Sequence, residues 1–497
     1  MGHEPADAVV LGGGPAGLSA AIALAGRGLR TIVVTLARNE GDRIGESLSP
    51  AAGPLLRELG VWEAFVADGH APCFGNSSAW GSGELRHHDF LRDPLGQAWH
   101  IDRRRFESRL AERAASAGAT IVLTPRSPHC ERIGDRWCVS VGAGGDLIET
   151  RFLLDATGRS SWLGRRCGAR RIDEDRQVAL VAFLEAQAGP LEDTTTLVEA
   201  LDRGWWYSAA LPDGRLVTTF MTDHDLLPPG STDADHWFSL LAAAPHTRRR
   251  LAEGCYRPGS PVRVVAASSG RLAPMTGPGW AAIGDAAMCY DPLASHGLTV
   301  ALASGRDAAE AVSAQLSGEL GAIDRFSARL SDAFAGYTAM RLDVYRAERR
   351  WPNAPYWMRR HRQQDQADGV AETLQGKPYF GAHFATEINS TIAFPTWNGH
   401  FRVFHRENAM AESIKQKAED AGHKVAEKAK DVGASVAQKA SDAGHKVAEK
   451  ATQAGNAVGE KVGEATNWAK DKAHQAGEKI EEAGDAAKKK IDNAAKN

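Results

Sequence analysis

The first 410 residues are almost without lysine. Lys377 is the only lysine before residue 411, whereas residues 411–497 hold 16 lysines and no arginine. Long apolar runs are also missing, and none approaches the roughly 20 residues that cross a bilayer. A net charge of −3 gives no electrostatic reason to expect a nucleic acid partner. The change of composition near residue 410 indicates two segments of different origin, joined naturally or by engineering.

Paired cysteines are absent as well. The six cysteines are scattered without a CxxC pair, which argues against a zinc site and against a disulfide framework. The polar start MGHEPAD runs straight into an apolar segment and does not resemble a secretion signal. We therefore expect a cytoplasmic protein with no membrane span and no metal site.

The tail from residue 410 to residue 497 has an 11-residue period. DAGHKVAEKA occurs at 420–429 and again at 442–451, with DVGASVAQKA between them at 431–440. An 11-residue period places one side chain per repeat on a slowly drifting helix face, but the repeated glycines weaken such a helix. The tail resembles the repeats of late-embryogenesis-abundant proteins. That resemblance implies a segment that is disordered or helical and acts as a solubility module or contacts surfaces.

A glycine-rich turn near the N-terminus predicts a dinucleotide site. The apolar segment 8–11 leads into GGGPAG at 12–17, and a run of small residues typical of a helix follows. Gly12 permits the tight turn, Gly14 lets the backbone approach a pyrophosphate, and Gly17 allows close helix packing, while the helix start faces the phosphates. The phosphate loop also includes Pro15 and Ala16. The next strand, at 31–35, ends in Thr35 where an acidic residue is usual, so we expect a weaker ribose contact from its hydroxyl.

Four further motifs follow in a fixed order along the chain. They are RIGESLSP at 43–50, WHIDRRRFESRLAERA at 99–114, DATGRSS at 155–161 and GDAAMCYDPLASHG at 284–297. Together with the glycine turn they resemble the FAD-binding signatures of the FAD-dependent monooxygenase and flavin-dependent halogenase superfamily, which has a para-hydroxybenzoate hydroxylase type of fold. The resemblance implies an α/β fold in which a Rossmann-like FAD-binding domain is interleaved with an antiparallel-sheet substrate domain.

The resemblance also implies roles for individual residues. Asp285 would bond the ribityl chain, Arg103 would contact FAD, and the loop around Glu46 would line the isoalloxazine. Gly297 opens a helix whose partial positive charge suits the flavin edge where a reduced ring gathers negative charge. The complete set of cofactor residues carried over in this way is Arg43, Glu46, Ser47, Arg103, Gly284, Asp285, Pro292, Ser295, Gly297 and Leu298.

Between these motifs, residues 177–222 alternate as four antiparallel strands with a Pro-Asp-Gly turn before the last. In the resembled fold this sheet forms the wall of the substrate pocket. Trp205, Trp206 and Tyr207 are then candidate pocket residues, and they can equally belong to the core.

Three departures argue against the halogenase branch. That branch uses a lysine after the GESL-type loop, and this region has none; its tryptophan-specific members place a glutamate where this chain has Ala294. The WxWxIP motif of halogenases becomes YSAALP at 207–212. A halogenase and a flavin-dependent reductase of isoprenoid double bonds stay open as alternatives.

The NSSAW stretch at 76–80, Trp99-His100 and ERRWPNAPYWMRRH at 348–361 resemble a subgroup of flavoprotein maturases that oxygenate tryptophan residues of partner proteins. This resemblance implies hydroxylation of an aromatic through a flavin hydroperoxide, with O2 as co-substrate and with NAD(P)H or a separate flavin reductase as electron donor. The substrate is an aromatic small molecule or a protein or peptide. His296 and His100 are candidate proton carriers, because imidazole titrates near neutrality, and each can instead be structural.

The expected domain order follows from these motifs. Residues 1–175 would form the first part of the FAD-binding domain, with a substrate-side insertion at about 70–100, and 176–265 the substrate sheet. Residues 266–320 would return to the FAD-binding domain, 321–409 would form a helical and aromatic-rich region, and 410–497 the repeat tail.

Overall fold

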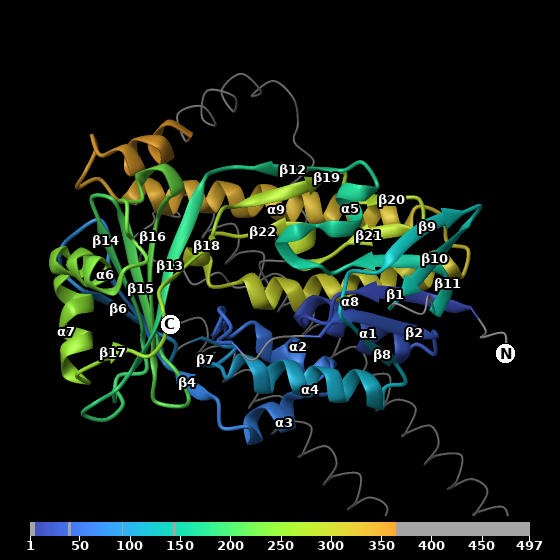
Figure 1. The fold of residues 1–497 in the computed structure, drawn as a ribbon, viewed down its shortest axis with the longest axis horizontal. Coiled ribbons are helices and arrows are strands. Elements are labelled where there is room, and N and C mark those ends of the chain that lie inside the picture. Colours follow the sequence, from blue (N-terminus) through green and yellow to red (C-terminus); the bar gives the residue numbers. More distant parts are fainter. Residues whose placement is uncertain (1–4, 38–40, 92, 143–145, 364–497) are drawn as a thin grey trace, which may run out of the picture. The chain divides into compact units, whose positions relative to one another are not determined.

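Two large sheets dominate the described part of the chain. The computed structural model describes residues 5–37, 41–91, 93–142 and 146–363. Figure 1 shows the first sheet on the right and the second on the left, with helices lying along both. No helix in these ranges is long and apolar enough to cross a membrane. The expected repeat tail and the aromatic-rich stretch after residue 363 lie outside the described residues.

The first sheet has a parallel centre, as expected of a Rossmann-like domain. Its strand order is β20-β21-β11-β1-β2-β8, and the hairpin of β9 and β10 extends β11. β1 pairs in parallel with β11 and β2, and β2 with β8. The strands are β1 (Ala6–Leu11), β2 (Thr31–Leu36), β8 (Thr120–Thr124), β9 (His129–Ile133), β10 (Arg136–Val141), β11 (Asp146–Asp155), β20 (Thr276–Gly277) and β21 (Trp280–Ala282). The strands predicted at 8–11 and 31–35 are confirmed.

Helices from distant parts of the sequence pack against this sheet. Helices α1 and α8 pack closely against each other, since a Cβ on Gly305 of α8 would lie 2.2 Å from the Ala16 carbonyl oxygen. Ser19 of α1 donates a hydrogen bond of 2.6 Å to the Leu302 carbonyl of α8. The α-helices of the described residues are α1 (Pro15–Ala25), α2 (Ala52–Glu58), α3 (Trp62–Ala67), α4 (Arg103–Ser116), α5 (Trp162–Arg166), α6 (Ala234–Leu240), α7 (Pro245–Glu253), α8 (Gly297–Leu316) and α9 (Ala322–Ala347).

The second sheet confirms the four antiparallel strands predicted between 177 and 222. Its order is β17-β13-β16-β15-β14-β5-β6, with β18 beside β13. All neighbours are antiparallel except β14 and β5, which are parallel. The strands are β5 (Gly75–Ala79), β6 (Arg86–Asp89), β13 (Gln177–Glu185), β14 (Thr196–Leu201), β15 (Gly204–Ala210), β16 (Leu216–Asp223), β17 (Arg257–Pro258) and β18 (Arg263–Ala266).

Both faces of this second sheet are covered. Successive side chains of a strand point to opposite faces, so β15 sends Trp205 and Tyr207 to one side and Trp206 to the other. Trp206 lies in a core with Trp237 of α6 and Leu251 of α7. Trp205 lies in a different core with Trp357 and residues near the end of α9. The apolar cover on each face explains why β13 is buried almost throughout.

Two small sheets join segments that are far apart in sequence. One consists of β3 (Ser47–Leu48), β7 (Ala98–His100) and β4 (Ala71–Cys73), and it fixes the loop that precedes Ser47. The other consists of β12 (Arg170–Asp173), β19 (Gly270–Ala273) and β22 (Met288–Cys289). The two small sheets therefore fix segments that carry the sequence motifs next to the two large sheets.

Candidate active site

A cavity of about 1200 Å³ brings the predicted motifs together. It is lined by the β1–α1 turn, the end of β2, the loop 41–47, the start of α4, the turn after β11 and segment 283–298. One face of the second sheet closes it. The predicted site residues that line it are Gly12, Gly14, Pro15, Ala16, Thr35, Arg43, Glu46, Ser47, Arg103, Tyr207, Asp285, Pro292, Ser295, His296, Gly297 and Leu298.

Close backbone contacts require glycine at two positions of the turn between β1 and α1. Gly12 has φ +115°, and a Cβ there would lie 2.3 Å from the Ala156 carbonyl oxygen. A Cβ on Gly17 would lie 1.9 Å from the Gly12 carbonyl oxygen, so Gly17 supports the turn from behind and does not line the cavity. Gly14 precedes the first residue of α1. The helix start thus presents its amide groups to the cavity.

Thr35 is the second-last residue of β2, which ends at Leu36, one residue beyond the predicted end. Its hydroxyl oxygen would lie 2.9 Å from a Cβ placed on Gly13, so the two positions are in contact. The exposed end of β2 therefore offers a hydroxyl to the cavity, and its role toward a ribose stays a prediction.

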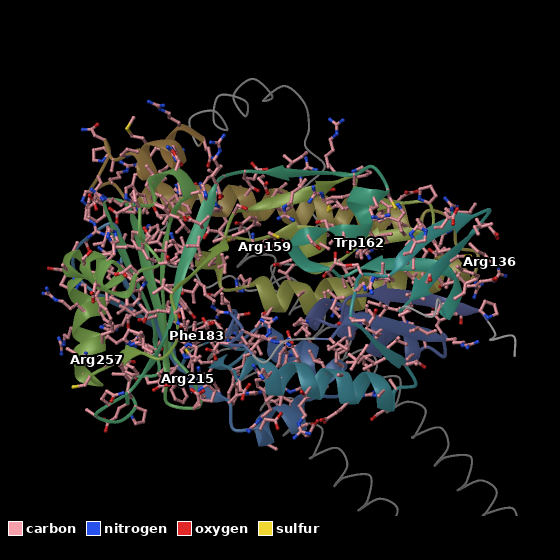
Figure 2. All side chains as sticks on the ribbon, viewed as in Figure 1. Arg136, Arg159, Trp162, Phe183, Arg215 and Arg257 are labelled. Carbon is pink, nitrogen blue, oxygen red and sulfur yellow. The ribbon has the colours of Figure 1, made fainter. Side chains whose placement is uncertain are left out.

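The loop 41–47 is tied to both neighbouring layers. Arg103 of α4 donates a 2.9 Å hydrogen bond to the Gly45 carbonyl oxygen. At the second sheet, Arg215 bonds the Asp42 carboxylate at 2.8 Å, and Arg263 donates to the Asp42 carbonyl oxygen at 3.1 Å. Figure 2 shows Arg215 beside Phe183 of β13, whose ring centre lies 5.6 Å from the guanidinium carbon. The loop is therefore fixed at the boundary between the two sheets.

Two predicted cofactor-contacting arginines share one carboxylate. Arg103 and Arg43 both pair with Glu107 of α4. Glu107 is buried, so its charge is compensated by these cations. In the described residues both arginines thus hold the loop and α4 together while still lining the cavity.

Tyr207 reaches from the second sheet to the same loop. Its hydroxyl donates a hydrogen bond to Glu46 Oε1 and lies 2.7 Å from the Ser47 hydroxyl oxygen. Glu46 Oε2 accepts a second hydrogen bond, of 3.1 Å, from the Gly45 amide. Burial first and the Glu46 charge second raise the pKa of Tyr207 well above its usual range. The phenol therefore stays protonated at neutral pH.

The 284–298 segment forms the opposite edge of the cavity. Asp285 lies 3.6 Å from Arg159, a cavity residue labelled in Figure 2 that also donates to the Ser268 carbonyl. Gly284 has φ +56° and packs on Ala16, where a Cβ would approach the Ala16 Cβ to 2.7 Å. Gly284 therefore permits contact between the turn and α1, and it does not line the cavity.

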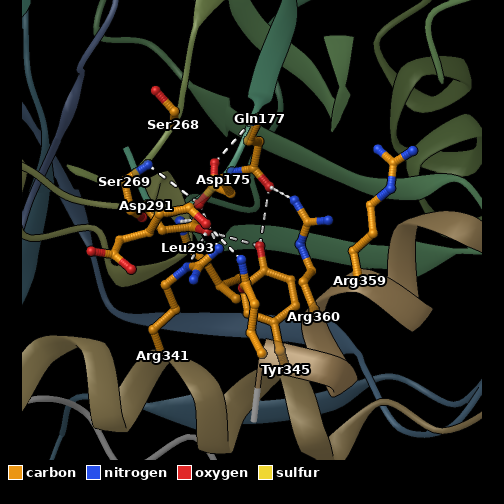
Figure 3. Close-up of polar contacts among 12 residues, drawn as sticks. Asp175, Gln177, Ser268, Ser269, Asp291, Leu293, Arg341, Tyr345, Arg359 and Arg360 are labelled. Atoms are coloured by element: carbon orange, nitrogen blue, oxygen red, sulfur yellow. Dashed lines mark hydrogen bonds and ion pairs between the residues drawn. The ribbon is translucent and has the colours of Figure 1, made fainter. Parts of the chain in front are cut away.

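A buried polar network holds the turn that precedes α8 (Figure 3). Asp291 accepts hydrogen bonds from the Leu293 amide and, through its other oxygen, from Arg341 at 3.2 Å and Tyr345 at 2.9 Å. Arg341 also bonds Asp175, whose pKa is raised mainly by burial. The network continues to Gln177 of β13, which accepts from Tyr356 and Arg360 of the ERRWPNAPYWMRRH motif. The motif at 348–361 thus supports the site indirectly, through hydrogen bonds to residues that in turn hold the turn before α8.

The two candidate histidines lie in different places. His296 lines the cavity, is 1 % exposed, and has its pKa lowered to about 4 by burial. His100 does not line the cavity. Its Nε2 lies 3.0 Å from the Thr196 hydroxyl oxygen, and burial, followed by the Arg250 charge, lowers its pKa to about 4. His100 is the register partner of Ser47 in the small sheet, but its imidazole contacts Thr196 and does not line the cavity.

The two candidate tryptophans also lie outside the cavity. Trp205 donates a 2.9 Å hydrogen bond to the Tyr356 hydroxyl in the aromatic core, and Trp206 packs on the opposite face with its ring centre 5.2 Å from that of Trp237. Of the three candidate pocket residues, only Tyr207 therefore lines the cavity. Trp206 points to the opposite face because side chains alternate along a strand, and Trp205, on the same face as Tyr207, is covered by the aromatic core around Trp357.

Several residues of the site were not predicted from the sequence. Asp155 accepts hydrogen bonds from Thr157 and from the Gly164 amide, and so holds the DATG turn against the cavity. Arg159 and Asp291 line the cavity too. Their signal was present in the motifs DATGRSS and CYDPLASHG, but the role of Arg341 had none, since an arginine within a helix usually faces water.

These residues fit FAD by their own geometry. Neighbouring backbone leaves no room for a Cβ at Gly12 or Gly17, which keeps the turn tight, and the α1 start at the cavity provides amide donors for a pyrophosphate. The cavity then runs from this turn to the apolar face of the second sheet, which suits a long ligand with a flat ring at one end.

Comparison with known proteins supports this assignment. A family model described as FAD binding domain matches residues 5–226. The putative FAD-dependent oxidoreductase LodB of Marinomonas mediterranea is 26% identical over 366 residues, which are 72% of this chain and 97% of LodB.

Two solved structures are similar as well. The peptidyl tryptophan dihydroxylase QhpG, essential for tryptophylquinone cofactor biogenesis, has a TM-score of 0.58 and 25% identity, over 72% of this chain and 79% of QhpG. The myxobacterial chondrochloren halogenase CndH has a TM-score of 0.64 and 21% identity, over 76% of this chain and 91% of CndH. The chain thus contains an FAD-binding domain like that of flavin-dependent halogenases and monooxygenases, and it is an FAD-dependent enzyme.

Proposed function

We propose that this FAD-dependent enzyme is a monooxygenase that hydroxylates an indole ring, namely that of a tryptophan residue in a peptide or protein. The observation that carries the proposal is the part of the cavity formed by the second sheet and β18, which we name the sheet wall. It consists of Ala179, Val181, Tyr207, Thr219, Met221, Val265, Ala266 and Ala267.

The sheet wall is mostly apolar and carries no cation. Its small side chains leave space for a flat aromatic ring, and within this set Tyr207 and Thr219 supply the hydroxyl groups. The arginines that line the cavity, Arg43, Arg103 and Arg159, come from other elements. A free amino acid would bring a carboxylate without a counter-charge on this wall, at a high desolvation cost. A tryptophan residue presents neutral amides, so the wall favours it.

Bound FAD would supply the activated oxygen, with O2 as oxidant and with NAD(P)H or a separate reductase as electron source. The residues of this chain hold and enclose the reactants. The glycine turn and α1 start would bind the pyrophosphate, and Thr35 and Asp285 would bond the sugar and ribityl hydroxyls. The Gly297 end of α8 would favour negative charge on the ring. The buried apolar wall excludes water from the reacting atoms.

The absence of lysine favours hydroxylation over halogenation. No lysine occurs before Lys377, so none of the described elements can supply the lysine that the halogenase branch uses. Ala294 also stands in the turn where tryptophan halogenases carry a glutamate. Halogenation is the second candidate, because a halogenase shares this fold at a TM-score of 0.64.

The test is product analysis with the FAD-loaded full chain, a flavin reductase, NADH and ¹⁸O₂. The probes are N-acetyltryptophanamide, free tryptophan and, as a matched control, N-acetylphenylalaninamide, each with and without bromide. We expect ¹⁸O in the product of N-acetyltryptophanamide, a slower reaction with free tryptophan and none with the phenylalanine amide. A brominated product in place of the oxygenated one would overturn the proposal in favour of halogenation.

A further inference from the structure

Eight carboxylates are buried among the described residues, and most have an evident reason to be there. Five pair with arginine, which compensates the charge. These pairs are Asp68 with Arg109, Glu107 with Arg103, Asp223 with Arg360, Asp291 with Arg341 and Glu348 with Arg350.

Two others accept several hydrogen bonds at the start of a helix or turn. Glu199 accepts from the amides of His246 and Thr247 at 3.1 Å and 2.7 Å, at the beginning of α7. Asp155 accepts from the amides of Thr157 and Gly164. Amide donors at a helix start stabilise a negative charge in place of a cation.

Glu46 has neither kind of compensation. It is 5 % exposed and lines the cavity, and its hydrogen-bond partners in the described part of the chain are the Gly45 amide and the Tyr207 hydroxyl. No arginine of the described ranges forms an ion pair with it. A carboxylate has about four acceptor positions, so two remain available. A buried carboxyl group that lines a cavity and keeps free acceptor positions can accept a proton from a reacting group within hydrogen-bond reach.

We propose that Glu46 is the general base of the oxygenation and that Tyr207 relays the proton to it. The inference rests on the proposed function. When a C–O bond forms at an aromatic carbon, the C–H bond there must break and its electron pair must return to the ring. The proton passes to the Tyr207 oxygen while the phenolic proton passes to Glu46 Oε1, which becomes a carboxylic acid. Oxygen and electrons come from O2 and the bound, reduced cofactor, as in the parent reaction.

The positions of the two residues suit this transfer. Tyr207 belongs to the sheet wall, where the ring would lie, and Glu46 belongs to the loop on the cofactor side. The Ser47 hydroxyl, 2.7 Å from the Tyr207 oxygen, can hold that oxygen in place during the exchange. The loop itself is fixed by Arg103 through the Gly45 carbonyl, so the carboxylate is held without being neutralised.

The experiment uses Glu46→Gln, Glu46→Asp and Tyr207→Phe in the FAD-loaded full chain. Glu199→Gln is the matched control. Among the described residues, Glu199 is a similarly buried carboxylate with no arginine partner, and it is not among the residues that line the cavity. The probe is N-acetyltryptophanamide with a protiated or a deuterated indole ring. FAD affinity is measured by quenching of flavin fluorescence.

We expect Glu46→Gln to slow turnover roughly 10²- to 10⁴-fold, the usual contribution of a general base. It should also raise the deuterium isotope effect on product formation, because breaking the C–H bond becomes limiting. Glu46→Asp should restore part of the rate, Tyr207→Phe should show a smaller loss with the same rise in isotope effect, and FAD affinity should stay within a fewfold of the parent. Glu199→Gln should leave the isotope effect unchanged.

Parent-like turnover or an unchanged isotope effect in Glu46→Gln would overturn the proposal while leaving the hydroxylase function intact. Loss of FAD binding in Glu46→Gln would instead make Glu46 a cofactor residue and also overturn it. A parent enzyme that oxygenates no indole probe would overturn the proposed function, and the base with it, so the two failures are distinguishable.

Discussion

At the scale of single residues, the site depends on positions where only one side chain fits. Gly12 combines φ +115° with a contact that a Cβ would close to 2.3 Å. Gly28, in the turn after α1, has φ +78°, but a methyl group at that position would meet nothing within 4 Å. Comparing substitutions at Gly12 and Gly28 therefore distinguishes the effect of backbone strain, which both share, from the effect of a steric collision, which only Gly12 has.

We therefore expect Gly12→Ala to weaken FAD binding by tenfold or more, since about 1–2 kcal/mol of conformational strain adds to a backbone collision. Gly28→Ala should lower the free energy of unfolding by about 1–2 kcal/mol and leave FAD affinity unchanged. Fluorescence titration with FAD and urea unfolding measure the two effects. Equal loss of FAD affinity in both variants would show that the cradle at Gly12 has no special role.

The sequence predicted the identity of many cavity residues but not their state of charge. Arg43 and Arg103 were expected to contact the cofactor, and both line the cavity. Their pairing with Glu107 was not predicted. The spacing of Arg103 and Glu107 within the motif at 99–114 is compatible with a helical pair, but the partner from the loop, Arg43, is brought to Glu107 only by the tertiary fold. Glu46 was predicted as a cofactor-binding residue, and the lack of an arginine partner for it among the described residues is a property of the surrounding fold, which no local motif encodes.

At the scale of elements, the sequence pattern predicted where the strands lie and in what order, but not which side of the sheet faces the cavity. The strands between 177 and 222 were predicted because apolar residues and turns mark them. The side of the sheet that faces the cavity depends on α6, α7 and the motif at 348–361, which cover the other positions. The sequence therefore left Trp205 and Trp206 open between pocket and core, and the structure places them in two separate cores.

Helix α9 carries the clearest element-level prediction. Arg341 is buried between Asp175 and Asp291, and it keeps two like charges from facing each other without a cation. Arg341→Met should lower the free energy of unfolding by about 3–5 kcal/mol, because uncompensated charges stay behind. FAD affinity should fall as well, since Asp291 holds the turn before α8.

The control is Arg325→Met on the same helix, whose guanidinium is exposed and pairs with Glu319. An exposed pair contributes about 0–1 kcal/mol, so this variant should resemble the parent in urea unfolding and in FAD titration. Similar losses of stability and FAD affinity in both variants would mean that the integrity of α9 in general, and not the buried ion pairs of Arg341, stabilises the turn before α8.

At the scale of the whole molecule, the site is assembled from segments spread along the chain from Leu11 to Ala301. The short motifs in these segments predicted that they bind one cofactor, because their glycine-rich turns and their order along the chain are typical of an FAD site. The cavity between two sheets is a property of the tertiary fold. The paired network from Asp291 to the motif at 348–361 shows that residues beyond the family-matched range 5–226 also support it.

The lysine-rich tail gives the last prediction. The repeats of residues 411–497 are rich in Gly, Ala and Lys, a composition that buries little apolar surface. A chain that ends at residue 410 should therefore bind FAD with unchanged affinity and keep its turnover in dilute buffer. Its solubility at high concentration should fall, because a highly charged segment has been removed. Absorbance of bound flavin, oxygen consumption and light scattering measure these three properties, and a truncated chain that loses flavin or turnover would show that the tail takes part in the fold of the enzyme.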